Sequence, residues 1–368
     1  MRNNLLIAGI IILTLLILAI LLSFLYPGPP IKNIEKAKNE IALARKMKAN
    51  IYAETTFNKA ELLYNKMMEE WKYQNSRFFI FRNFNKVDEY SLQIIALCSR
   101  SHKEANENLN SLIKKLNLTF DKYLKTANIC DTLIKALPFS KNQVKDYTRL
   151  KLSLLQAYNY FVNSEYKESD HLLKNIAVDY EIITTDIINI SKMYFVDHEK
   201  WVKWHDNLVL WSRKNNAYAI FVDKMARVCR LYNSGKIVAE YPVDLGQKWM
   251  GNKHYQGDNA TPEGMYKIIK KLGKNQSIYY KAFLLNYPND EDKKRFSEGK
   301  KTGKIPHNAK IGGLIEIHGE GGKGVHWTNG CVALSNRHMD ELFNKVEIGT
   351  PVLIVGSLKS FNELFNFE

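Results

Sequence analysis

Three patterns of hydrophobic and polar positions follow one another along the chain, and the first is an uncharged apolar run. Residues 5–25 contain no charged side chain, and only Gly9, Thr14 and Ser23 interrupt the apolar residues. A helix of this length spans about 30 Å, the thickness of the hydrocarbon core of a bilayer. The run is longer than the apolar region of a cleavable signal peptide and ends without a small-x-small cleavage site. It predicts an uncleaved transmembrane signal anchor, with its exit linker, over residues 1–30.

The second pattern is helical. Residues 34–200 contain no glycine and one proline, Pro138, and their apolar residues recur at intervals of three and four, as on one face of a helix. An aromatic residue, a small residue three positions later and apolar residues six and seven positions later occur from Phe57 and again from Tyr166. This arrangement resembles the packing of tetratricopeptide-like helical hairpins, but no period of about 34 residues runs through the segment. We therefore expect a helical domain over residues 31–200, built as a bundle or an irregular array of hairpins.

The third pattern, after about residue 201, combines frequent glycines with short β-rich runs. Asn233-Ser234-Gly235 joins two of these runs as a turn. A helix is expected over residues 337–346, with Ser335 or Asn336 as its N-cap. These features predict a β-rich domain over residues 201–368, with its core at about 215–356. The predicted strands cover residues 218–222, 228–232, 237–243, 279–285, 314–317 and 352–355.

Composition supports a folded protein of several domains. The chain has 368 residues, of which 45% are hydrophobic and 12% aromatic, and this excludes disorder over most of its length. The cysteines, at positions 98, 130, 229 and 331, have no paired spacing, so neither a disulfide scaffold nor a structural zinc site is expected. The histidines show no HExxH-like spacing, and we expect neither a metal nor a cofactor. The net charge is +15, but no helix-turn-helix, RNA-recognition or zinc-finger pattern occurs, so nucleic acid is not expected as a partner.

Candidate chemistry lies in a histidine and a cysteine at the ends of two predicted strands. His318 precedes Cys331 by 13 positions. A thiol is only a few per cent ionised at pH 7, so a nucleophilic cysteine needs a base beside it, and an imidazole from a neighbouring strand supplies one. Gly330 allows a tight turn that directs backbone N–H groups at an oxyanion. His326 lies five residues before Cys331 and is the alternative base, although a loop or substrate-lining role fits it better.

These residues stand in a recognisable order. His318-Gly319 is followed by Thr328-Asn329-Gly330-Cys331-Val332, and upstream the segments 241–246, 260–266 and 285–289 carry further motifs, among them Thr-Pro-Glu-Gly at 261–264. Over about 140 residues this C-terminal part resembles the L,D-transpeptidase catalytic domain, the YkuD (ErfK/YbiS/YcfS/YnhG) family, and its Gly-Cys-Val-Ala-Leu segment is similar to the YafK-like branch. The helical region has no part in the resemblance.

The resemblance implies a β-sandwich with a short helix, and an enzyme that acts on peptidoglycan stem peptides. In that role Cys331 attacks the peptide bond between the L-centre of residue three and D-Ala at position four, which forms a thioester and releases D-Ala. His318 then serves as the base for an incoming side-chain amine, and a 3-3 crosslink results. The carbonyl of Gly319 orients the imidazole. The N–H groups of Gly330 and Cys331 form the oxyanion hole, Thr328 braces the nucleophile loop, and Asn329 and His326 line the substrate site.

Two departures from the family pattern leave the reaction open. Asn329 stands where many members have His, Lys or Arg, and Ala333 stands where many have an Arg. The alternatives are an L,D-carboxypeptidase, a hydrolase of links between proteins and peptidoglycan, and a non-catalytic wall-binding scaffold.

The expected fold is therefore a multi-domain α plus β protein with a transmembrane helix, an all-helical region and a β-rich catalytic domain. We expect a single-pass membrane protein in cell-wall biogenesis and cell shape, with a cytoplasmic N-terminus and an extracytoplasmic catalytic domain. Its expected partners are peptidoglycan stem peptides, the membrane and an envelope protein bound by the helical domain.

Overall fold

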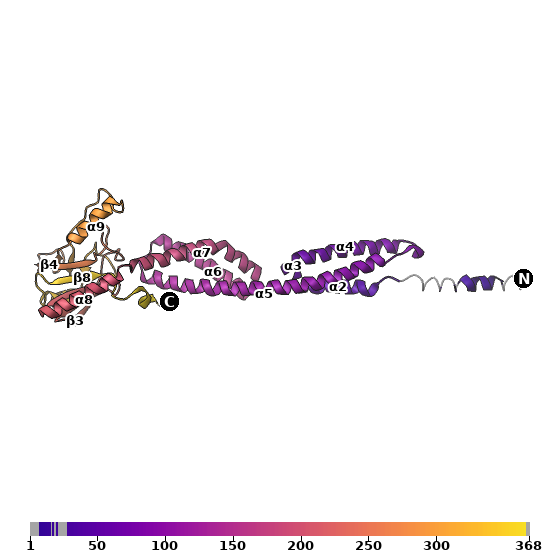
Figure 1. Cartoon of the computed structure of the whole chain (residues 1–368), viewed down its shortest axis with the longest axis horizontal. Coiled ribbons are helices and arrows are strands. Elements are labelled where there is room, and N and C mark those ends of the chain that lie inside the picture. Colours follow the sequence, from indigo (N-terminus) through magenta and orange to yellow (C-terminus); the bar gives the residue numbers. More distant parts are fainter. Residues whose placement is uncertain (1–6, 16, 18–19, 21–27, 366–368) are drawn as a thin grey trace. The chain divides into compact units, whose positions relative to one another are not determined.

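The computed structural model describes residues 7–15, 17, 20 and 28–365. The chain divides into two compact units (Figure 1), the first comprising residues 1–121 and 160–170 and the second residues 122–159 and 171–368. The second unit thus includes helices that precede the β-rich region as well as that region itself. The domain boundaries expected at residues 30 and 200 remain predictions.

The predicted transmembrane anchor is wrong. Within the described residues, 7–15, 17, 20 and 28–365, no helix has both the length and the apolar character needed to cross a membrane. This finding overturns the transmembrane helix expected within residues 1–30 and the single-pass localisation that depended on it. The prediction rested on the apolar, uncharged composition of residues 5–25, of which the structure describes residues 7–15, 17 and 20. Residues 5–6, 16, 18–19 and 21–25 of the predicted span lie outside the described residues.

The first unit is helical, as predicted. Its core combines small residues such as Ala37 and Ala60 with larger side chains such as Phe57, Met67 and Ile94, all of which are buried in one cluster. Small residues at helix contacts allow the helix axes to approach closely. The elements are α2 (Ile31–Lys46), α3 (Ala49–Tyr52), α4 (Glu54–Ser76), the short 3-10 helix η1 (Phe79–Phe81) and the first part of α5 (Asn85–Ala136).

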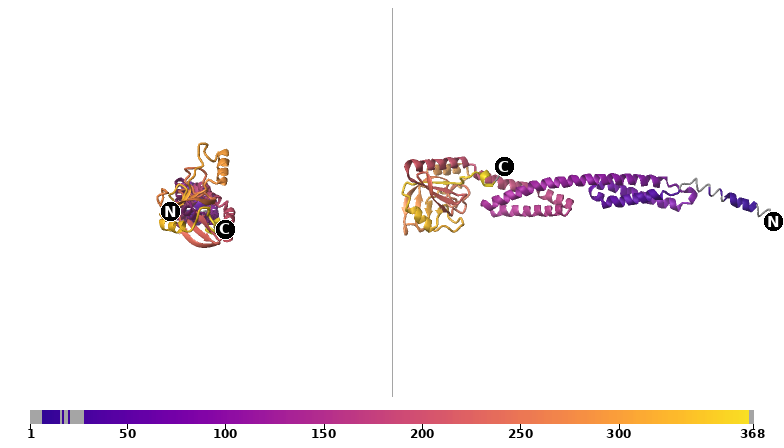
Figure 2. Two further views of the ribbon diagram at one scale, coloured as in Figure 1. Left: turned by 90° about the vertical axis from the view of Figure 1, so that its left-hand side faces the viewer. Right: turned by 90° about the horizontal axis from the view of Figure 1, so that it is seen from below.

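The helices of the second unit continue into the β-rich region through a shared core. These are the end of α5, most of α6 (Lys141–Val162), most of α7 (Tyr166–Tyr194) and α8 (His198–Asn215). The end of α6 and the start of α7, within residues 160–170, belong to the first unit. Leu133, Tyr147 and Ile187 belong to the same buried cluster as the central strands. Tyr194 at the end of α7 donates a hydrogen bond from its hydroxyl to the carbonyl of Gly356 at 3.1 Å. Helix α8 packs on β1, β2 and β8 of the sheet (Figure 2).

The sheet has eight strands in the order β3-β2-β1-β8-β4-β5-β6-β7. Neighbours are antiparallel except β1 with β8 and β6 with β7, which are parallel. Strands β1 and β8 are almost completely buried along their length, as continuous apolar runs predict. The strands are β1 (Tyr218–Asp223), β2 (Val228–Asn233), β3 (Lys236–Pro242), β4 (Gly264–Leu272), β5 (Ala282–Leu285), β6 (Glu316–His318), β7 (Val332–Ala333) and β8 (Pro351–Val355).

Three further helices complete the unit: α9 (Asp290–Lys301), α10 (Asn336–Phe343) and α11 (Phe361–Phe365). The expected helix after residue 336 is confirmed as α10, and Ser335 caps it by accepting the N–H of His338 at 3.3 Å. Strand β4 and helix α9 were not predicted. The domain is β-rich as predicted, and β4 is the strand that joins β8 to β5 in the sheet.

Candidate active site

The parallel pairing of β6 with β7 brings the predicted histidine and cysteine together. Ile317 is opposite Val332 and His318 is opposite Ala333, so Cys331, one residue before β7, lies across from Glu316. Side chains alternate between the two faces of a sheet. Glu316, His318 and Cys331 therefore share one face, and Cys331 lines a pocket.

Cys331 is partly exposed, whereas Cys98, Cys130 and Cys229 are buried free thiols. Its Sγ accepts the backbone N–H of Glu316 at 3.4 Å and lies 3.7 Å from the carbonyl oxygen of Leu314. Burial raises the pKa of the Cys331 thiol to about 11. The Glu316 N–H acts in the opposite direction, while the Glu316 carboxylate adds to the increase in this pKa. The resting sulfur is therefore a protonated thiol.

The loop before Cys331 is closed by two hydrogen bonds to Thr328. The Thr328 hydroxyl donates to the carbonyl of Cys331 at 2.7 Å, and its Oγ1 accepts the N–H of Gly330 at 3.2 Å. Gly330 has φ +131°, and a Cβ at this position would lie 2.6 Å from the carbonyl oxygen of Ala260. Only glycine fits both the backbone conformation and this close approach. Of the two N–H groups predicted for the oxyanion hole, that of Gly330 is thus already bonded.

His318 is fully buried, and its two ring nitrogens are in different environments. Nδ1 lies 2.6 Å from the carbonyl oxygen of Gly319, which requires a proton on Nδ1. Nε2 is buried and has no hydrogen-bond partner among the described residues. Burial lowers the pKa of His318 to about 4, against the opposite effect of the Gly319 carbonyl. The imidazole is therefore neutral at pH 7, and its Nε2 is able to accept a proton.

Two aromatic rings enclose this imidazole. Tyr279 is stacked on His318, with ring centroids 3.6 Å apart and an angle of 9° between the planes. Trp327 meets His318 edge-on, with centroids 5.9 Å apart, and the Nζ of Lys323 lies 3.6 Å from the centroid of the Trp327 ring. Apolar contact on both sides explains why the charged form of His318 is disfavoured.

The buried carboxylate of Asp244 holds the loop that carries Trp327. Asp244 accepts the backbone N–H groups of Lys323 at 2.9 Å and Gly324 at 3.1 Å, together with the indole N–H of Trp327 at 3.3 Å. Neither Asp244, Trp327 nor Tyr279 was predicted as part of the site. No spacing in the sequence relates them to His318, because each comes from a different connecting segment.

His326 is placed apart from this arrangement. Its Nδ1 accepts the N–H of Leu245 at 3.1 Å, and its ring centroid lies 5.7 Å from that of Trp249. Burial lowers the pKa of His326 to about 4. Among the described residues that line the pocket beside Cys331, His326 is not included. Its contacts are those of a residue that supports the loop at Leu245.

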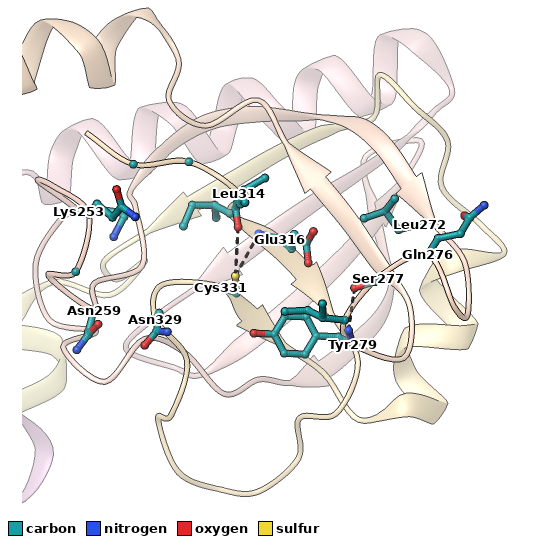
Figure 3. Close-up of a pocket in the computed structure, with 16 residues that line it drawn as sticks. Lys253, Asn259, Leu272, Gln276, Ser277, Tyr279, Leu314, Glu316, Asn329 and Cys331 are labelled. Atoms are coloured by element: carbon teal, nitrogen blue, oxygen red, sulfur yellow. Dashed lines mark hydrogen bonds between the residues drawn. The ribbon is translucent and has the colours of Figure 1, made fainter. Parts of the chain in front are cut away.

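The pocket beside Cys331 has a volume of about 560 Å³ and is drawn in Figure 3. Lys253 and Glu316 are the charged residues in its described lining, and they lie on opposite sides of the sulfur (Figure 3). Asn329 lines the pocket as predicted, and Tyr279 forms part of its wall. The other lining residues are Gln256, Gly257, Asn259, Leu272, Gln276, Ser277, Ile278, Gly312, Gly313, Leu314 and Ile315.

Lys253 is already paired within the protein. Its Nζ lies 2.6 Å from a carboxylate oxygen of Asp258, and both side chains are buried. Asp258 also accepts the backbone N–H groups of His254, Tyr255 and Ala260. The described residues contain no group of three or more His, Cys, Asp or Glu side chains arranged to hold a metal ion.

Comparison with known proteins confirms the predicted resemblance of the C-terminal region. Residues 217–354 match the model of the L,D-transpeptidase catalytic domain, YkuD. YafK of Escherichia coli K12, whose name marks it as a candidate L,D-transpeptidase, is 33% identical over 133 residues, which cover 36% of this chain and 43% of YafK. The YafK of Escherichia coli O157:H7 matches equally. The chain thus spans 43% of the length of these relatives.

Solved structures of L,D-transpeptidases are also similar to part of this chain. The enzyme of Xylanimonas cellulosilytica is 16% identical with a TM-score of 0.27, and the match covers 38% of this chain and 60% of that one. The enzyme of Mycobacterium smegmatis is 14% identical with a TM-score of 0.23, and the match covers 37% of this chain and 58% of that one.

Proposed function

We propose that the chain is a cysteine-dependent L,D-transpeptidase that acts on the stem peptides of peptidoglycan. The observation that carries the proposal is the partly exposed Cys331 thiol on the same sheet face as the neutral His318 imidazole, within the region that matches the L,D-transpeptidase catalytic domain. A nucleophile and a base on one face of the sheet are the groups that acyl transfer through a thioester requires.

In the first half-reaction, the Cys331 thiol gives its proton to Nε2 of His318 as the sulfur attacks the carbonyl of residue three. The tetrahedral oxyanion accepts a hydrogen bond from the Cys331 N–H, since the Gly330 N–H is bonded to Thr328. The intermediate collapses with cleavage of the C–N bond, and the amine of D-Ala leaves with the proton from Nε2. The product is a thioester on Cys331.

In the second half-reaction, His318 accepts a proton from an incoming amine as the amine attacks the thioester. The C–S bond breaks, a new amide bond forms, and the sulfur recovers a proton from Nε2. The Gly319 carbonyl supports both steps because it keeps the proton on Nδ1 and leaves Nε2 to exchange protons.

The test is incubation of the purified chain with disaccharide-tetrapeptides, followed by mass spectrometry of the products and of the intact protein. Cys331→Ala is the matched control. We expect a wild-type acyl-enzyme and a crosslinked dimer lighter by one D-Ala, and neither with Cys331→Ala. Loss of D-Ala without formation of a dimer would show that the enzyme is a carboxypeptidase and does not form crosslinks. Absence of an acyl-enzyme, or turnover by Cys331→Ala, would overturn the proposed mechanism.

A further inference from the structure

The carboxylate of Glu316 has no assigned role in this mechanism, although it lies in the pocket beside the nucleophile. Its own backbone N–H is the group that contacts the Cys331 sulfur, at 3.4 Å. The side chain is half-buried and lines the pocket. No hydrogen bond or ion pair of the Glu316 carboxylate occurs among the described residues.

An unpaired charge in this position is costly. Burial raises the pKa of Glu316, which reflects the poor solvation of its charged form. The same carboxylate raises the pKa of the Cys331 thiol, so it opposes formation of the nucleophilic thiolate. A carboxylate with a perturbed pKa in a pocket is typical of a functional site.

The other charges of the pocket do not compensate the charge of Glu316. Lys253 is bonded to Asp258 and lies across the sulfur from Glu316 (Figure 3). Burial is the cause of the raised pKa of Glu316, whereas Lys253 acts on the thiol and lowers the pKa of Cys331. The aromatic neighbour of Glu316 in the pocket is Tyr279 (Figure 3), whose pKa the Glu316 carboxylate helps to raise. A carboxylate beside an aromatic ring suits a cation, because the face of the ring also attracts positive charge.

We propose that Glu316, with Tyr279 as the aromatic wall, binds a primary ammonium group of the substrate next to the Cys331 sulfur. The inference rests on the proposed function and names the chemistry that this pocket selects. The ammonium group has two possible sources, the side chain of residue three in the acyl donor and the amine of the acceptor.

The two sources use Glu316 in different steps. An ammonium group on the donor pairs with the carboxylate during acylation and cancels the charge that opposes the thiolate. An acceptor ammonium gives one proton to the Glu316 carboxylate, and the neutral amine then attacks the thioester. A second proton passes from the amine to the departing sulfur, and the protonated Glu316 later releases its proton to water.

The experiment compares wild type, Glu316→Gln and Glu320→Gln. Glu320→Gln is the control, because it removes an exposed carboxylate two residues after His318. Acylation is followed by intact-protein mass spectrometry with two tetrapeptide donors, one with a free amine on residue three and one with that amine acetylated. Thioester aminolysis is followed separately after excess donor is removed and an amine acceptor is added.

If the donor supplies the ammonium group, wild type acylates at least about tenfold faster with the free amine, since a hydrogen bond to a charged group is strong. Glu316→Gln loses this preference and Glu320→Gln keeps it. If the acceptor supplies it, Glu316→Gln slows only aminolysis. Equal behaviour of wild type and Glu316→Gln in both steps overturns the inference.

A second readout needs no turnover, so it separates this inference from the proposed function. The alkylation rate of Cys331 is measured against pH with Nα-acetyl-lysine amide or with the same compound acetylated on its side-chain amine. We expect the free amine to lower the pKa of the Cys331 thiol in wild type and not in Glu316→Gln. No difference between the two compounds in wild type would refute an ammonium site even in a chain that forms no acyl-enzyme.

Discussion

The ring of Tyr279 lies parallel to the imidazole of His318, with the two centroids 3.6 Å apart, and the same ring forms part of the wall of the pocket that holds Cys331. Tyr279 lines the pocket, whereas His318 is fully buried and is absent from its described lining. The tyrosine ring covers one face of the imidazole, so we expect it to limit the access of water to the base and thereby to favour its neutral form.

Replacement of Tyr279 by alanine is expected to raise the pKa of His318 from about 4 towards its ordinary value. Burial lowers this pKa because the charged imidazole loses its hydration, and removal of the ring admits water on one face. The pKa is measured by NMR titration of the imidazole protons in wild type and Tyr279→Ala.

Tyr279→Phe is the matched control, since it keeps the ring and removes only the hydroxyl. Its His318 should titrate like that of the wild type. An unchanged His318 pKa in Tyr279→Ala would show that the rest of the protein keeps the imidazole dry and that the stacking is incidental.

The pH dependence of Cys331 alkylation follows from the state of the resting site. Since burial raises the pKa of the thiol to about 11 and lowers that of His318 to about 4, the pair is neutral at pH 7. Iodoacetamide reacts with the thiolate, whose fraction rises about tenfold for each pH unit below the pKa. The rate at Cys331 should therefore climb steadily from pH 7 to pH 10.

The alkylation is measured by peptide mass spectrometry, and Cys331→Ala reports the background from the three buried thiols. A rate that is already constant between pH 5 and pH 8 would indicate a thiolate–imidazolium pair in the free enzyme. In that case the assignment of a neutral resting pair is incorrect.

Sequence patterns predicted the elements of the second unit better than its site. Continuous apolar runs predicted β1 and β8 because both faces of these strands are buried. Helix α9 was missed because its composition is highly charged, although Asn289 and Asp292 form a capping box that marks its start.

The residues of the proposed catalytic pair could be located in the sequence from the order of His318-Gly319 and the segment that ends in Cys331, because these motifs are local. The sequence did not predict the contacts of Tyr279 and Asp244 or the role proposed for Glu316. Their contacts join segments that only the fold brings together. The transmembrane helix was predicted from hydropathy alone.

Substitution of Gly330 by alanine should disrupt the nucleophile loop. The residue has φ +131°, and the new Cβ would lie 2.6 Å from the backbone oxygen of Ala260, which has little freedom to move. We expect a loss of several kcal/mol in the free energy of unfolding or a displaced Cys331 with little activity. Urea unfolding and the acylation rate distinguish these results.

Gly313→Ala serves as the control because Gly313 also lines the pocket and nothing lies within 4 Å of its Cβ position. It should leave both stability and acylation close to wild type. A Gly330→Ala variant with wild-type stability and acylation would mean that the loop tolerates a different backbone conformation.

Substitution of Asp244 by alanine should loosen the loop that carries Trp327 and change the environment of His318. The buried carboxylate accepts two backbone N–H groups and the indole N–H, and its removal leaves these donors without their partner. The cost should be about 1–3 kcal/mol in the free energy of unfolding. Because Trp327 also packs edge-on against His318, the pKa of His318 should rise as water enters, and the acylation rate should fall.

Asp340→Asn tests whether these effects are particular to Asp244. Asp340 accepts hydrogen bonds from Tyr280 and Lys281 but is partly exposed, so water replaces the lost contacts at small cost. NMR titration of His318 and single-turnover acylation are measured for both variants. A purely structural role for Asp244 would lower stability and leave the His318 pKa unchanged. If Asp244 positions His318, the pKa of His318 and the acylation rate should change together. Asp244 holds Trp327, Trp327 packs against the imidazole of His318, and that imidazole is the proposed base in acylation.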